Sequence, residues 1–223
     1  MARLPFITFE GSEGCGKSTQ VRRLTKRLET ARIPVLVTRE PGGTPIGESI
    51  RELLQFAPQS AAMTPETELL LFEASRAQLV REIIKPALNK GHCVIADRFY
   101  DSTTVYQGIA RKLDQKIVRQ LNVFAVGDCI PDITFFLDVD FQTARSRMKG
   151  PRRPDRMEMQ PDGFYEEVIQ AYRELAKAEA DRVVMVDGSK SADAIEAEIW
   201  GIVCERFPQL AGKSKGKSPK SKM

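Results

Sequence analysis

The chain has 223 residues and a formal net charge of +4, from 34 Lys and Arg against 30 Asp and Glu. This length suits one domain of ordinary size, which can bury a core without support from disulfides or a structural metal. The sequence contains no apolar run near the ~20 residues that a membrane-spanning helix needs, and its start lacks a secretory signal. We therefore expect a cytoplasmic protein with no membrane partner.

The basic residues are unevenly placed along the chain. Residues 212–223 contribute five Lys and no acidic residue to the total, so residues 1–211 carry a formal charge of −1. We expect this Lys/Ser-rich tail to be disordered and the protein to have no nucleic-acid partner, although a nucleic-acid-binding arm is the alternative. The four Cys lack the paired spacing of a metal site, which favours reduced thiols.

Short β-rich runs alternate with longer helical patterns along residues 1–211. The sequence predicts strands over 6–10, 35–38, 93–96, 133–139 and 183–186. It predicts helices over 18–31, 46–56, 65–90, 114–126, 141–149, 162–180 and 191–206, with Pro86 as a possible kink. This alternation indicates an α/β fold with a five-stranded parallel sheet that has helices on both faces.

The first strand leads into a phosphate-binding loop, Gly-Ser-Glu-Gly-Cys-Gly-Lys-Ser-Thr, which matches G-x-x-x-x-G-K-[ST]. Backbone N–H groups of such a loop surround phosphates, and the following helix points its positive end at them. We expect Lys17 to neutralise the outer phosphates of a nucleoside triphosphate and Ser18 to bind Mg²⁺. We interpret Cys15 as a small residue that fills a position in the loop. A redox-sensitive thiol is the alternative. The residues expected to bind the nucleoside triphosphate are Gly11, Ser12, Glu13, Gly14, Cys15, Gly16, Lys17, Ser18 and Thr19.

Charged residues follow the second and third predicted strands. Open parallel sheets bind ligands at the carboxyl ends of their strands, and guanidinium groups suit a dianionic phosphate. We expect Arg39 and Arg98 to clamp a monophosphate, with a surface ion pair as the alternative for either. Asp97 can reach Mg²⁺ from its strand end, directly or through water, with a helix N-cap as its alternative role.

The long helix over 65–90 carries an aromatic residue and a cation on one face. Phe72 and Arg76 are four residues apart and therefore neighbours on the helix surface. An aromatic ring beside a guanidinium group suits a pyrimidine base. Plain core packing is the alternative for Phe72.

A basic segment between residues 141 and 158 is interrupted by Gly150, Pro151 and Pro154, which should end the preceding helix. We expect a short lid over about 145–160 that closes cations over the γ-phosphate and excludes water. A solvated charge is the alternative for Arg145 and Lys149. The cations of the segment are Arg145, Arg147, Lys149, Arg152, Arg153 and Arg156.

Three further strings accompany the phosphate loop: T-R-E-P-G-G-T at 38–44, L-F-E-A-S-R at 71–76 and D-R-F-Y-D-S-T-T-V-Y-Q-G at 97–108. Together they closely resemble thymidylate kinases, over about residues 4–207. The resemblance implies a P-loop NTPase fold, with one kinase domain over 1–211, that transfers the γ-phosphoryl group of ATP to dTMP. The product, dTDP, belongs to dTTP biosynthesis. Such enzymes are homodimers joined through helices.

The resemblance also implies roles for individual residues. The aromatic ring of Phe72 stacks on thymine, Arg76 hydrogen-bonds its edge, and Tyr106 disfavours ribonucleotides. Because the phosphate loop contains no Arg, the chain resembles the bacterial class whose catalytic Arg comes from the lid, with Arg147, Arg152 and Arg153 as undecided candidates. The implied dTMP-binding residues are Glu13, Arg39, Phe72, Arg76, Arg98, Thr103, Tyr106 and Gln107. The implied catalytic residues are Lys17, Asp97, Arg98 and the three lid candidates, with Ser18 and Asp97 at the metal.

Two other functions remain open at the level of sequence. A pocket that accepts thymine also accepts a base without its methyl group at a loss of only about 1–3 kcal/mol, so a kinase for dUMP or another pyrimidine nucleotide is one alternative. A non-catalytic or regulatory ATPase that binds no monophosphate is the other.

Overall fold

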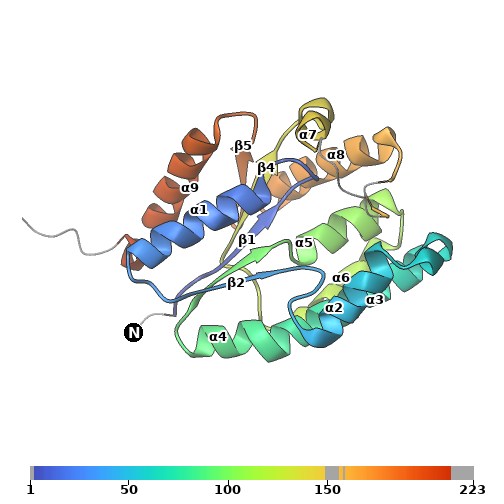
Figure 1. The fold of residues 1–223 in the computed structure, drawn as a ribbon, viewed down its shortest axis with the longest axis horizontal. Helices are drawn as coiled ribbons and strands as arrows, with labels where there is room; N and C mark the ends of the chain where they lie inside the picture. Colours follow the sequence, from blue (N-terminus) through green and yellow to red (C-terminus); the bar gives the residue numbers. More distant parts are fainter. Residues whose placement is uncertain (1–2, 149–155, 158, 212–223) are drawn as a thin grey trace, which may run out of the picture.

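The computed structural model describes residues 3–148, 156–157 and 159–211. Its centre is a parallel sheet in the order β2-β3-β1-β4-β5 (Figure 1). The strands are β1 (Phe6–Glu10), β2 (Val35–Arg39), β3 (Cys93–Asp97), β4 (Ile133–Asp138) and β5 (Val183–Asp187). The five predicted strands are confirmed, and each observed end lies within one residue of the prediction.

Helices cover both faces of this sheet, as predicted (Figure 1). Along β1, Ile7 and Phe9 pack into a core with α1 and α9, whereas Phe6 points to the opposite face. This alternation follows from the two-residue period of a strand. The helices are α1 (Lys17–Thr30), α2 (Pro45–Gln55), α3 (Pro65–Leu79), α4 (Lys85–Asn89), α5 (Tyr100–Thr103), α6 (Gln115–Val126), α7 (Phe141–Arg147), α8 (Asp162–Ala178) and α9 (Ala192–Arg206).

The helix predicted over 65–90 contains a π-helical turn at Val80–Ile84, between α3 and α4. Pro86 comes two residues after the end of this turn, in the first turn of α4. Because proline has no N–H and its ring crowds the carbonyl four residues earlier, the regular α-helical pattern cannot continue through it. The kink expected at Pro86 therefore takes the form of a widened turn on its N-terminal side.

The segment after β3 is helical, which the sequence patterns did not predict. It forms α5 and a π-helical segment, Thr104–Ala110. Its β-branched and aromatic residues are poor helix formers, but Val105 and Tyr106 are buried against α8. Tertiary packing therefore outweighs local propensity here, and it turns this segment toward the carboxyl end of the sheet.

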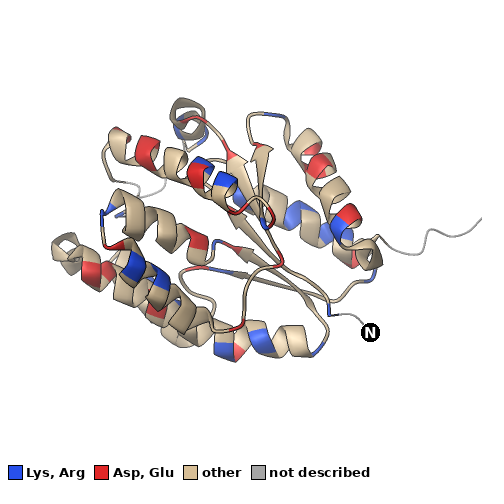
Figure 2. Ribbon diagram, turned by 180° about the vertical axis from the view of Figure 1, so that it is seen from behind, with Lys and Arg blue, Asp and Glu red and all other residues tan. Residues whose placement is uncertain are grey.

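Each of the five strands ends in a charged residue: Glu10, Arg39, Asp97, Asp138 and Asp187. Figure 2 shows the strands otherwise free of charge, with acidic and basic residues mainly on the helices and connecting segments. The register pairs Asp97 with Phe9 on one side and with Arg39 on the other. Because the strands are parallel, these ends meet at one edge of the sheet, where the phosphate loop begins.

Some predicted features lie outside the described residues, namely Lys149, Arg152 and Arg153 of the expected lid and the tail at 212–223. Among the residues that the structure does describe, no helix is long and apolar enough to cross a membrane.

Candidate active site

The phosphate loop connects β1 to α1 and depends on glycine for its shape. Gly16, which precedes the first residue of α1, has φ 101°, and Gly14 has φ 76°. A side chain at Gly14 would also collide with the carbonyl group of Ala144. Both positions therefore favour glycine, which adopts positive φ without steric strain. The loop can thus turn its backbone toward a phosphate chain at the N-terminus of α1.

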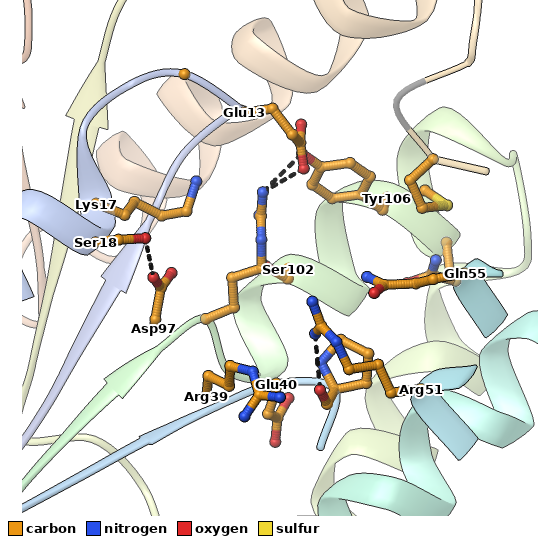
Figure 3. Close-up of a pocket in the computed structure, with 15 residues that line it drawn as sticks. Glu13, Lys17, Ser18, Arg39, Glu40, Arg51, Gln55, Asp97, Ser102 and Tyr106 are labelled. Carbon is orange, nitrogen blue, oxygen red and sulfur yellow. Dashed lines mark hydrogen bonds and ion pairs between the residues drawn. The ribbon is translucent and has the colours of Figure 1, made fainter. Parts of the chain in front are cut away.

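Lys17 lies on the inner side of this loop. Its Nζ donates to the carbonyl oxygens of Gly11, at 3.0 Å, and Ser12, at 2.8 Å. The side chain is only 7% exposed and lines the central cavity (Figure 3). A phosphate chain bound in the loop would contact this ammonium group, which is the role that the sequence predicts for Lys17.

Ser18, at the start of α1, faces Asp97, the last residue of β3. The Ser18 hydroxyl donates to Oδ2 of Asp97 at 2.7 Å (Figure 3). A hydroxyl and a carboxylate are hard oxygen ligands that suit Mg²⁺, which usually takes few protein ligands and completes its shell with phosphates and water. The donor set therefore fits the predicted metal. The residue that caps α5 is Phe99, so the alternative role of Asp97 as an N-cap is not observed.

Arg98, Glu13 and Tyr106 form a second charged group in the same cavity. The Arg98 guanidinium donates to Oε1 of Glu13 at 2.5 Å and lies 5.2 Å from the centre of the Tyr106 ring. The Tyr106 hydroxyl donates to Oε2 of Glu13 at 3.0 Å. Arg98 itself has φ 71°, a left-handed backbone conformation that is unusual for a residue with a side chain.

The cations beside Glu13 stabilise its ionised form. Burial alone would raise the pKa of Glu13, but Arg98 and Lys17 outweigh that effect, and the pKa lies below its ordinary value. Burial also raises the pKa of Tyr106 well above its ordinary value, so this hydroxyl stays protonated and acts as a donor. The cavity thus presents a fixed carboxylate beside a fixed guanidinium group.

Arg39 and Arg51 reach the cavity from β2 and α2. Arg39 Nη2 donates to Glu48 at 2.9 Å with both side chains nearly half exposed, so the ion pair weighed as its alternative role is present. Arg51 Nη1 donates to the carbonyl oxygen of Pro41 at 3.0 Å. Both arginines line the cavity, where they could meet an anion (Figure 3).

Arg76 lies behind the cavity wall and is 1% exposed. Its guanidinium group binds both carboxylate oxygens of Glu40, at distances of 2.6–3.1 Å. It also donates to Glu73 at 2.8 Å and to the hydroxyl of Thr103 at 3.0 Å. Burial raises the pKa of Glu40 to about 7, although Arg76 opposes this shift. The described cavity lining includes Glu40 but neither Phe72 nor Arg76, whose contacts with a base therefore stay predictions.

Gln107 reaches the cavity from the π-helical segment, with its Nε2 donating to Glu68 at 2.7 Å. Arg147 instead points toward the segment after β5, where its Nη1 donates to the carbonyl oxygen of Gly188 at 2.8 Å. A Cβ at Gly188 would lie 3.4 Å from the carbonyl oxygen of Cys15, so this segment borders the phosphate loop. The lid role of Arg147 stays a prediction.

The cavity has a volume of about 310 Å³ and joins both charged groups. Six lining residues received no role in the sequence analysis. Arg51 and Gln55 were detectable in principle, because they are four apart on one helix and so share a face. Nothing in the local sequence indicates that Met157 reaches the cavity. The six are Glu40, Pro41, Arg51, Gln55, Ser102 and Met157.

Comparisons with known proteins agree with this geometry. The family model described as thymidylate kinase matches residues 9–199. Thymidylate kinase from Deinococcus radiodurans is 43% identical over 201 residues, which cover 90% of this chain and 97% of the relative. Thymidylate kinase from Fervidobacterium nodosum is 47% identical over 194 residues, or 87% of this chain and 95% of the relative.

A solved structure supports the same assignment. The crystal structure of thymidylate kinase from Ehrlichia chaffeensis superimposes with a TM-score of 0.73 at 35% sequence identity, covering 91% of this chain and 99% of that chain. The five-stranded parallel sheet with helices around it is therefore a P-loop NTPase fold. The chain belongs to the thymidylate kinase family.

Proposed function

We propose that this protein transfers the γ-phosphoryl group of ATP to dTMP and releases dTDP and ADP, a step of dTTP biosynthesis. The observation that carries the proposal is that the phosphate loop and the group of Arg98, Glu13 and Tyr106 open into one cavity. The phosphate groups of two nucleotides can therefore meet in this cavity. The family assignment supports dTMP as the acceptor.

At the donor end, the loop amides and Lys17 hold the phosphates of ATP and draw charge toward the leaving group. Ser18 and Asp97 would hold Mg²⁺, which would supply further neutralisation of the phosphate charge. An oxygen of the dTMP phosphate attacks the γ-phosphorus while the bond to the β-phosphate oxygen breaks, so no covalent enzyme intermediate is needed. The candidates for a further cation over the γ-phosphate remain Arg147, Arg152 and Arg153.

At the acceptor end, Arg39 and Arg98 bind the dTMP phosphate. Arg98 is held by Glu13, which leaves its position well defined before substrate binds. Tyr106 fills the space beside the sugar, and Phe72, Arg76, Thr103 and Gln107 surround the base. Each of these roles predicts a loss of acceptor affinity when the side chain is removed.

Initial rates with dTMP, dUMP, dCMP, UMP and dGMP test the proposal directly. We expect dTMP to give the highest kcat/KM, and dUMP to follow because it lacks only a methyl group. A different first-ranked acceptor would refute the choice of dTMP. Rapid ATP hydrolysis without transfer to any monophosphate would instead favour the ATPase alternative.

We also propose that the protein acts as a homodimer in the cytoplasm. The support for the dimer is an apolar face on α3 and α6, where Leu70, Ile117 and Phe124 are 52–76% exposed. Ile117 and Phe124 are seven residues apart and so share one side of α6, and Leu70 lines a groove with Ile117. Phe124→Asp should convert the dimer to a monomer in sedimentation experiments, whereas Lys116→Asp, on the same helix, should not. Four free cysteines suit a reducing compartment.

A further inference from the structure

Glu68, on α3, is a buried carboxylate that receives hydrogen bonds from three side chains. It is 1% exposed, and its oxygens accept from Gln107 at 2.7 Å and from Arg111 at 3.3 Å. Arg156 also donates to it. A charged group persists at such depth only when it is paired and hydrogen-bonded, so these contacts define where the carboxylate lies.

The cations around Glu68 are themselves fixed by other parts of the fold. Arg156 donates from its Nε to the carbonyl oxygen of Leu54 at 3.0 Å, and from its backbone N–H to that of Gln55 at 3.2 Å. These are carbonyl groups at the C-terminal end of α2, which have no partner within the helix. Arg111 donates to Gln160 at 2.8 Å. Glu68 is therefore held between two positioned guanidinium groups and cannot easily turn.

This arrangement determines the orientation of the Gln107 amide. A glutamine side chain has a donor end and an acceptor end of similar shape, and either could face a flexible partner. A carboxylate only accepts, so Gln107 must present its Nε2 to Glu68. Its carbonyl oxygen then lies at the other end of the amide, away from Glu68, and Gln107 lines the cavity.

We propose that Glu68 is a positioning residue for acceptor specificity, because it holds the Gln107 carbonyl oxygen ready for the N3–H group of a 2,4-dioxopyrimidine base. Cytosine carries a lone pair instead of a proton at N3, so two acceptors would face each other. Glu68 acts through Gln107 and does not touch substrate. The inference rests on the proposed function, since it requires a pyrimidine monophosphate in the cavity.

The test compares dTMP with dCMP in Glu68→Ala. Without the carboxylate, the Gln107 amide is free to turn and offer an N–H to cytosine. We expect the ratio of kcat/KM for dTMP over dCMP to fall by roughly tenfold, mainly through KM. A change that lowered kcat/KM for both acceptors in the same proportion would mean that Glu68 is merely structural, and would overturn the proposal.

Two matched variants separate orientation of the amide from general loss of charge. Arg111→Met removes a cation from Glu68 but keeps the hydrogen bond to Gln107, so the ratio should stay within about twofold of the wild type. Glu66→Gln changes an exposed glutamate on the same helix and should also leave the ratio unchanged. A tenfold fall in Arg111→Met would overturn the proposal, because the ionic network alone would then explain the effect.

Circular dichroism and thermal melting establish whether Glu68→Ala is folded. If it is not, Glu68→Gln decides the question, because its amide fills the same space but can donate as well as accept. In Glu68→Gln the ratio of kcat/KM for dTMP over dCMP should fall at least threefold, but less than in Glu68→Ala. An unchanged ratio would overturn the proposal. A wild-type protein that failed to phosphorylate any pyrimidine monophosphate would refute the proposed function itself, whereas an unchanged ratio in an active variant would refute only the role of Glu68.

Discussion

The two ends of the cavity are built in different ways. At the donor end, the phosphate loop supplies Lys17 and Ser18 from one continuous segment, and only Asp97 comes from elsewhere. At the acceptor end, side chains from distant segments meet through buried charges such as Glu40 and Glu68. A local motif therefore provides the chemistry on phosphate, whereas discrimination between acceptors depends on the tertiary structure.

Lys17→Ala should have the largest effect, because it removes the ammonium group from the donor end. We expect kcat to fall by roughly 10³-fold or more, since this charge acts on phosphates in a partly dehydrated cavity. The loss should be equal with dTMP and dUMP, as initial rates can show. Lys26→Ala, an exposed change on the same helix, is the matched control. A loss of kcat that differed between dTMP and dUMP would contradict the assignment of Lys17 to the donor end alone.

Arg76→Met should act on the acceptor end through stability as well as binding. It leaves Glu40 and Glu73 without their buried cation, and breaking a buried ion pair in this way costs about 3–5 kcal/mol. Denaturant titration should show this decrease in the free energy of unfolding, and the KM for dTMP should rise more than kcat falls. Arg119→Met, at an exposed site on α6, should change stability by less than about 0.5 kcal/mol. A change in kcat alone would contradict the proposed role of Arg76 at the base.

The raised pKa of Glu40, at the acceptor end, predicts that the free energy of unfolding depends on pH. Its pKa is about 7 in the folded protein against an ordinary value of 4.5, so the folded state binds the proton more tightly than the unfolded state. The stability that this contributes is complete below pH 4.5 and is lost as the pH rises to about 7, a decrease of up to about 3 kcal/mol. Unfolding titrations between pH 5 and 8 should show this slope.

The matched variant for this prediction is Glu40→Gln, which keeps the size of the side chain but cannot titrate. Its free energy of unfolding should fall less steeply than that of the wild type over the same pH range. Equal slopes in the two proteins would show that Glu40 does not carry the effect. The Gly43 N–H and Arg39 hold the pKa of Glu48 below its ordinary value. Glu48→Gln should therefore not reduce the slope of the free energy of unfolding against pH.

Deletion of residues 212–223 should have the smallest effect, because this Lys/Ser-rich segment belongs to neither end of the cavity as we propose it. We expect kcat and the KM for dTMP to stay within about twofold of the full chain. A clear fall in the transfer rate would assign the tail a function and would extend the site beyond these two ends.

The sequence predicted the parts of the structure that depend on neighbours in the chain. The five strands, the phosphate loop and the charged residues at the ends of β2 and β3 all follow from local patterns. Even the departure at Pro86 has a local cause, although the π-helical turn that accommodates it was not predicted. Local sequence therefore accounts for most of the fold and for the donor end.

The remaining features come from contacts between distant residues. Arg76 and Phe72 were correctly placed on one helix, but the contact of Arg76 with Glu40 spans 36 residues. The bond between Glu68 and Gln107 spans 39 residues, and that between Arg156 and Glu68 spans 88. The helical segment that carries Gln107 has weak helix propensity and forms through packing. A single sequence contains no periodic signal for such pairs.

The backbone at Arg98 has a consequence for protein engineering. Its positive φ would suit glycine, which relieves strain on the order of 1–3 kcal/mol at such positions. Arg98→Gly would relieve that strain but would also leave the largely buried Glu13 without its cation, and removing one partner of a buried ion pair costs about 3–5 kcal/mol, so the substitution should lower the stability of the fold. Libraries built to harden this scaffold should keep residue 98 constant.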